Sequence, residues 1–153
     1  MGLDMYLIGR VYVKDWKHDY DNSQIPEDTP AKVSQKAIGS KFPVSEIELD
    51  LGYWRKANHI HKWFVDNVQG GEDECQKSYV SNDQLKQLHS ICCEILADHS
   101  KTELLPTKGG FFFGSTDYDE YYFKDIQDTK EILEKLFESG ELDKMSVYYQ
   151  ASW

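Results

Sequence analysis

The sequence predicts a single α+β domain over residues 1–153, in which an antiparallel or mixed sheet of about four strands carries about three helices packed on one face. Two observations predict this class. A chain of 153 residues, 40% of them hydrophobic and 14% aromatic, has the length and composition to bury one core. The spacing of the apolar residues also changes along the chain, in the order strand, strand, helix, helix, strand, helix, strand.

The first two strands are predicted by apolar residues at alternate positions. One alternation runs from Leu3 to Val13, and the chain then makes a long polar excursion over residues 15–43, with room for a short helix. The second strand has an apolar face formed by Ile47, Leu49, Leu51 and Tyr53. Its other face carries carboxylates spaced too widely along the strand to hold one ion, so we interpret it as a solvated surface.

The helices are predicted by apolar spacings of three and four and by their end signals. We expect the first from Trp54 to Val68, the second after the capping box that begins at Ser81, and the third after a cap at Thr116. Two short strands are expected at residues 111–113 and 145–151. The expected core includes Leu7, Ile60, Phe64, Leu88, Phe112 and Leu133.

The net charge and the cysteines indicate which partners and which cellular compartment to expect. The net charge is −10 at pH 7 and the basic residues are dispersed, so we expect no direct binding of nucleic acid. Cys75, Cys92 and Cys93 cannot all pair within the chain, which favours a reducing cytoplasm. No secretory leader and no apolar run of membrane-spanning length is apparent, so we expect a cytoplasmic protein without a membrane segment.

One cluster of basic and aromatic residues is the first candidate site. On a helix, Arg55, His59 and Lys62 fall on one face, opposite the apolar stripe and close to Trp54, with Trp153 a further aromatic candidate. Such a face suits an anionic or planar ligand. The alternative is a solvated helix face that pairs with the carboxylates of the second strand. We interpret His61 as a hydrogen-bonded structural residue.

The second candidate site is the glycine-rich segment at residues 110–118. Ser115 and Thr116 precede an expected helix, where backbone N–H groups and hydroxyls can hold a phosphate or carboxylate. Asp117 and Asp119 would repel an anion there, so ordinary helix capping is the alternative.

Signals for catalysis and for metals are weak. Residues two apart on a helix point about 200° from each other, so His59 and His61 cannot chelate one ion. The adjacent Cys92 and Cys93 are interpreted as core residues. We therefore expect no metal and no cofactor, no catalytic residues, and a binding protein rather than an enzyme.

Several motifs resemble a family of small proteins encoded by bacteriophages and prophages, and they cover nearly the whole chain. They are GLDMYL at residues 2–7, YWRKAN at 53–58, HKWFV at 61–65, GFFFGST at 110–116 and YYQ.SW at 148–153. The resemblance brings no catalytic residues with it. It implies a phage-type accessory protein in the cytoplasm of an infected or lysogenic bacterial host.

Three functions follow as hypotheses. The first is a phage accessory protein that binds and inhibits a host antiviral defence protein. The second is binding, and thereby sequestration, of a nucleotide-like signalling molecule. The third is a small hydrolase that uses His59 or His61 for proton transfer. The chain could also form a homo-oligomer.

Overall fold

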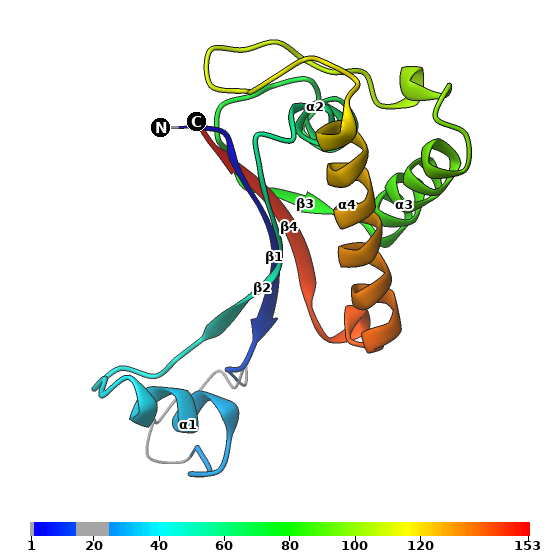
Figure 1. The fold of residues 1–153 in the computed structure, drawn as a ribbon. Coiled ribbons are helices and arrows are strands. Elements are labelled where there is room, and N and C mark those ends of the chain that lie inside the picture. Colours follow the sequence, from blue (N-terminus) through cyan, green and yellow to red (C-terminus); the bar gives the residue numbers. More distant parts are fainter. Residues whose placement is uncertain (1, 15–24) are drawn as a thin grey trace.

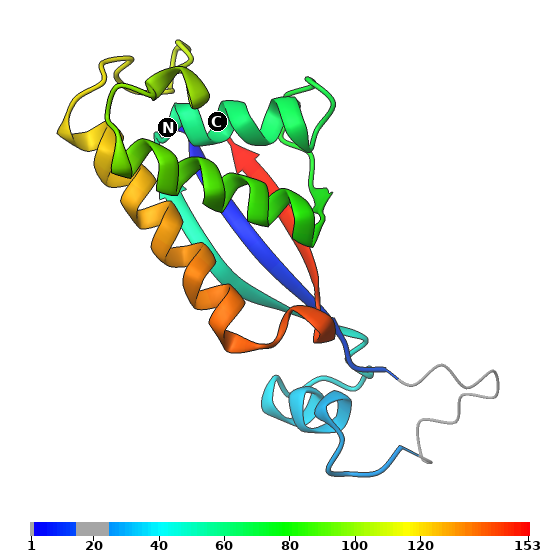
Figure 2. The same ribbon diagram turned by 90° about the vertical axis from the view of Figure 1, so that its right-hand side faces the viewer.

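The protein is described by a computed structural model for residues 2–14 and 25–153, and these residues form one antiparallel sheet covered on one face by helices. The strands are β1 (Asp4–Tyr12), β2 (Glu46–Arg55), β3 (Ser78–Val80) and β4 (Ser146–Ser152), in the spatial order β2-β1-β4-β3. Figures 1 and 2 show α2, α3 and α4 on the same side of this sheet. The predicted α+β class and the helices on one face are confirmed.

Three helices cover the sheet, α2 (Asn58–Asn67), α3 (Asn82–Ala97) and α4 (Glu120–Ser139), and side-chain caps mark the start of the last two. The predicted capping box at the start of α3 is present, because Ser81 and Gln84 bond each other's backbone N–H groups. Helix α4 begins later than predicted: its N-cap is Asp119, whose carboxylate accepts two backbone N–H bonds, and Thr116 lies in the preceding loop. No helix in the described ranges has the length and apolar character needed to cross a bilayer.

The polar excursion contains the short helix that the sequence allowed. Helix α1 (Pro30–Ala37) has Pro30 in its first turn and Thr29 as its N-cap, the arrangement favoured at helix starts. Figure 1 shows α1 beyond the lower ends of β1 and β2, away from the other helices. Residues 15–24 of the predicted excursion lie outside the described residues.

A β-bulge in β2 changes which of its residues face the helices. Leu7 pairs with Gly52 but Ile8 pairs with Asp50, so Leu51 is an extra residue in the ladder. After the bulge, Trp54 is buried and Tyr53 is 53% exposed. The predicted apolar face that included Tyr53 is therefore wrong at that end of the strand.

The first predicted helix starts four residues too early. Trp54 and Arg55 extend β2, where they pair with Met5 and Asp4, and Lys56 has a positive φ of 59° that ends the strand. Helix α2 begins only at Asn58. Arg55 therefore does not share a helix face with His59 and Lys62, which corrects the predicted arrangement of these three residues.

The strand predicted at residues 111–113 is a turn. Phe113 N–H bonds Gly110 O, and Gly114 has a positive φ of 84°. Phe111 is 95% exposed and Phe112 only half-buried, so the prediction of Phe112 as a core residue is wrong and Phe113 is buried instead. The other five predicted core residues are fully buried. The third strand of the sheet in chain order is β3 (Ser78–Val80), in place of the strand predicted at residues 111–113.

The face of the sheet opposite the helices carries tyrosines. Tyr6 and Tyr53 lie side by side with ring centroids 5.5 Å apart, and Tyr79 and Tyr148 form a second pair at 6.0 Å. The Arg10 guanidinium lies 4.7 Å from the Tyr148 ring centroid. The carboxylates of β2 are exposed to solvent, as predicted, and two of them, Glu46 and Glu48, pair with Arg10 of β1.

Candidate functional site

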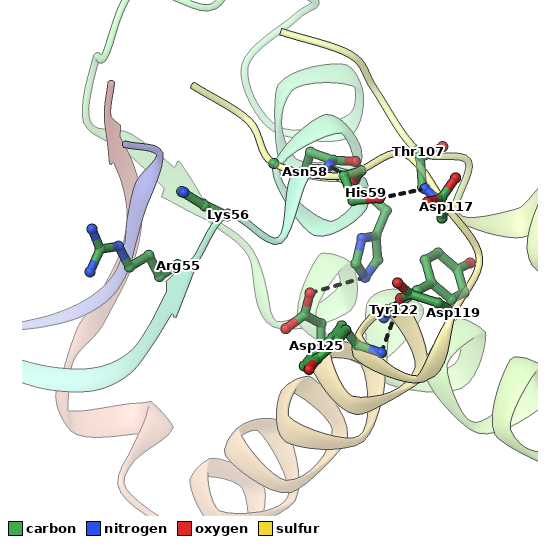
Figure 3. Close-up of a pocket in the computed structure, with 12 residues that line it drawn as sticks. Arg55, Lys56, Asn58, His59, Thr107, Asp117, Asp119, Tyr122 and Asp125 are labelled. Carbon is green, nitrogen blue, oxygen red and sulfur yellow. Dashed lines mark hydrogen bonds and ion pairs between the residues drawn. The ribbon is translucent and has the colours of Figure 1, made fainter. Parts of the chain in front are cut away.

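A pocket of about 290 Å³ lies between the corner from β2 to α2, the loop over residues 107–117 and the first turns of α4 (Figure 3). Its lining includes Asn58, His59, Asp117, Asp119, Tyr122 and Asp125. They come from three separate parts of the sequence, so only the folded chain brings them together.

The corner that forms one wall depends on two residues with positive φ. Lys56 and Gly114 both have left-handed backbone conformations, and they pack against each other. A Cβ atom on Gly114 would lie 3.1 Å from Lys56 Cβ and 3.4 Å from Lys56 O. The close contact and the backbone conformation both favour glycine at this position.

Asn58 fastens the loop to the start of α2. Its Nδ2 donates to Phe113 O at 3.0 Å and to Ser115 O at 2.8 Å, and its Oδ1 accepts from Lys108 N–H at 2.9 Å. Asn58 is 1% exposed, so these bonds are sheltered from water. One buried side chain thus holds both ends of the loop beside the pocket.

His59 is buried and lacks a hydrogen bond at one ring nitrogen. Its residue exposure is 2%, its Nε2 has no hydrogen-bond partner, and its ring packs against Tyr122 with centroids 4.4 Å apart. Burial lowers the pKa of His59 to about 4, an effect partly offset by the main chain of Tyr122. The imidazole is therefore neutral at physiological pH.

Asp125 approaches His59 from α4 but does not form an ion pair with it. Its Oδ2 lies 4.0 Å from His59 Nε2 (Figure 3). Burial, and to a smaller extent the nearby charge of Asp128, raises the pKa of Asp125 to about 7. By the pH at which His59 becomes charged, Asp125 has already taken up its proton.

The raised pKa of Asp125 predicts a pH-dependent effect of Asp125→Asn. The folded state keeps the Asp125 proton up to about pH 7, whereas the ordinary value is 3.8, so stability from this group falls as the pH rises between those values. Asp125→Asn should raise the free energy of unfolding by about 1–2 kcal/mol at pH 8, and it should have little effect at pH 4. The value at pH 8 allows for solvent screening of the partly exposed Asp125 side chain. Urea unfolding at both pH values measures this. Asp66→Asn is the control, and an equal effect of Asp125→Asn at pH 4 and pH 8 would contradict the assignment.

The interior of the pocket is acidic. Asp117, Asp119 and Asp125 line it, whereas the charged ends of Arg55 and Lys56 point away from His59 and Asp125 (Figure 3). Arg55 Nε lies 4.0 Å from Asp4 Oδ1, and both basic side chains run beside Gly2. Lys124, the lysine near Asp125, already pairs with Asp128, so the carboxylates of the pocket favour a positively charged guest.

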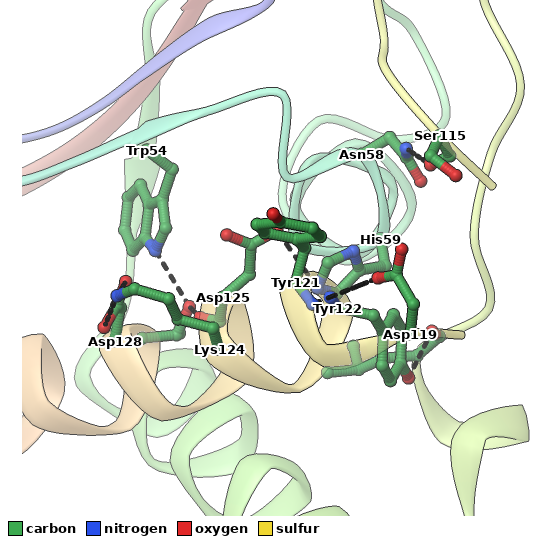
Figure 4. Close-up of polar contacts among 12 residues, drawn as sticks. Trp54, Asn58, His59, Ser115, Asp119, Tyr121, Tyr122, Lys124, Asp125 and Asp128 are labelled. Carbon is green, nitrogen blue, oxygen red and sulfur yellow. Dashed lines mark hydrogen bonds and ion pairs between the residues drawn. The ribbon is translucent and has the colours of Figure 1, made fainter. Parts of the chain in front are cut away.

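The structure places the sequence-predicted site residues in several locations. Arg55, His59 and Ser115 line the pocket. Trp54 is buried against α4, where its Nε1 donates to Thr129 Oγ1 at 2.8 Å, apart from His59 (Figure 4). The remaining three residues also lie elsewhere. Lys62 pairs with Asp66 on α2, Thr116 O accepts a bond from Thr107, and Trp153 Nε1 donates to Asp73 at 3.0 Å.

His61 belongs to a buried network, in agreement with its interpretation as structural. Its Nδ1 lies 2.7 Å from the Tyr149 hydroxyl and its Nε2 lies 2.9 Å from Asp73 Oδ2. Tyr149 is fully buried and stacks on Phe64 with ring centroids 3.9 Å apart. The hydroxyl thus lies in the core, and the three residues connect α2, β4 and the segment that carries Asp73.

Sequence reasoning missed most of the pocket. Asn58, Tyr122 and Asp125 were not singled out, because a site assembled from a corner, a loop and a distant helix leaves no local motif. Comparison of the chain with protein-family models, with curated proteins and with solved structures gives no match.

Proposed function

We propose that the protein acts by binding, and that the pocket accepts a cationic side chain, arginine above all, of a partner protein. The observation that carries this proposal is the acidic interior. Three carboxylates and a neutral, buried imidazole with an unpartnered nitrogen line a space of about 290 Å³. A guanidinium offers several donors that suit such a set of acceptors.

The rim supports the same kind of guest. Tyr121 lines the pocket and is 69% exposed, so its ring is available to stack on a planar cation. Asp119 already accepts two N–H bonds at the start of α4, which fixes its carboxylate in place. A cation would therefore meet groups that are largely preorganised.

The net charge and the resemblance define the proposed partner. A charge of −10 would speed association with a basic protein surface. The resemblance to phage-encoded proteins adds the context, in which that basic partner is a host antiviral defence protein and binding inhibits it.

A nucleotide-like ligand is less favoured by the same geometry. Its phosphates would face Asp117, Asp119 and Asp125, while Arg55 and Lys56 turn their charges outward. Binding a phosphate there requires both basic side chains to turn into the pocket, in addition to the cost of repulsion.

A small hydrolase remains a second candidate because of one specific observation. His59 is neutral and Asp125 is about half protonated near pH 7, so the pair can present a base next to an acid inside a pocket. Hydrolysis of chromogenic esters or phosphoesters that disappears in His59→Gln would favour catalysis over binding.

Binding of short blocked peptides tests the main proposal. By calorimetry at pH 8, a glycine-arginine-glycine peptide should bind wild-type protein, and a glycine-glutamate-glycine peptide should not. Asp125→Asn should weaken the arginine peptide about tenfold, as expected for loss of one charged hydrogen bond. Affinity should also fall from pH 8 to pH 6 as Asp125 gains its proton.

The control is Asp66→Asn, which removes the same charge from the exposed face of α2. It should leave the affinity within about twofold, because exposed charges at a distance are screened. Equal weakening by both variants would show that only net charge matters, and unchanged affinity in Asp125→Asn would rule out the pocket as the binding site.

A further inference from the structure

A cluster of three potential metal ligands lies where α3 packs against α4. His89 and Cys93 come from α3 and Glu134 from α4, and one ligand atom from each lies within 4.8 Å of the others. None of the three lines the pocket described above. All three are half-buried, so solvent can reach the cluster from one side.

The spacing matches that of a small coordination sphere. Cys93 Sγ lies 3.7 Å from His89 Nε2, which in turn lies 3.2 Å from Glu134 Oε1. In a tetrahedral zinc site with bonds of about 2.0 to 2.3 Å, ligand atoms are roughly 3.3 to 3.8 Å apart. His89 and Cys93 are four residues apart on a helix, so their side chains share a face.

The chemistry of the donors selects the class of metal. A thiolate, an imidazole and a carboxylate suit zinc and similar divalent transition metals, whereas calcium and magnesium prefer oxygen ligands alone. We propose that His89, Cys93 and Glu134 bind such an ion, with water in the fourth position. The proposal revises the expectation of no metal, since Glu134 joins the cluster only through the packing of α3 on α4.

Neighbouring residues offset the charge of the cluster and restrict its side chains when no metal is bound. Lys130 Nζ lies 2.8 Å from Glu134 Oε1 and offsets its charge, and a bound ion would take over that role. His89 packs edge-on against Phe137 with ring centroids 5.6 Å apart, which limits its movement. Cys92, the neighbour of Cys93 in the sequence, is fully buried and lies outside the cluster.

Cobalt(II) is the direct probe, because its thiolate complexes absorb in the near ultraviolet and its tetrahedral sites absorb in the visible. Titration of reduced, metal-free protein should give both bands, saturating at one cobalt per chain. Zinc should displace the cobalt and raise the thermal midpoint by about 5 °C when present well above its dissociation constant. No thiolate band at equimolar cobalt would overturn the proposal.

Matched variants locate the site. Cys93→Ser should abolish the thiolate band and the zinc-dependent shift in midpoint, and Glu134→Gln should weaken zinc binding about tenfold or more. Cys75→Ser, which alters another free cysteine outside the cluster, should leave both signals unchanged. A band that persists in Cys93→Ser or disappears in Cys75→Ser would assign the metal elsewhere and contradict the proposal.

Discussion

Phe64→Ala is expected to lower the free energy of unfolding by about 3–5 kcal/mol. Phe64 is fully buried on α2, stacks on Tyr149 at 3.9 Å and meets Trp54 and Trp63 with ring centroids at 6.0 and 5.2 Å. Removing the ring deletes apolar contacts and leaves a cavity between the helix and the sheet. Urea unfolding followed by tryptophan fluorescence measures the loss.

Phe111→Ala provides the control for this prediction. Phe111 has the same side chain but is 95% exposed, so its removal should change the unfolding free energy by no more than about 0.5 kcal/mol. Similar midpoints for Phe64→Ala and wild-type protein would show that α2 does not pack as described.

Asn58→Ala is expected to cost about 2–4 kcal/mol and to loosen the loop over residues 107–117. The change removes three hydrogen bonds at once and leaves two carbonyls and one N–H without their partner in a sheltered place. Amide hydrogen exchange should therefore speed up at Lys108, whose N–H bonds the Asn58 side chain.

Asn67→Ala is the matched variant on the same helix. Its Nδ2 makes one bond, to Trp63 O at 2.8 Å, so the expected cost is about 1 kcal/mol or less. A loss of stability in Asn58→Ala no larger than that in Asn67→Ala, with unchanged exchange at Lys108, would contradict the role given to Asn58.

The fold could be predicted from the sequence because its signals are local. Alternating apolar residues indicate β1, and the pair of Ser81 and Gln84 marks the start of α3. The errors arose where tertiary structure overrides a local pattern. The bulge at Leu51 shifts the pairing register of β2 by one residue. Residues 111–113, whose three phenylalanines are typical of a buried strand, lie in a turn closed by the bond from Phe113 N–H to Gly110 O.

The candidate site was predictable only in part. His59 was predicted on the helix face opposite the apolar stripe. In the structure it is buried in the first turn of α2, where its ring packs against Tyr122 of α4. Asp125 lies on α4, and nothing near it in the sequence indicates that it would meet His59. Contacts between distant segments are set by packing, so local motifs do not reveal them.

Nuclear magnetic resonance of the histidine and tyrosine rings during titration with N-acetyl-arginine amide at pH 8 tests the central claim most directly. If the pocket accepts a guanidinium, the signals of His59, Tyr121 and Tyr122 should shift together, and Tyr53 on the opposite face of the sheet should not move. Unmoved His59 and Tyr122 signals at concentrations that shift Tyr53 would place any binding on the tyrosine face and contradict the account.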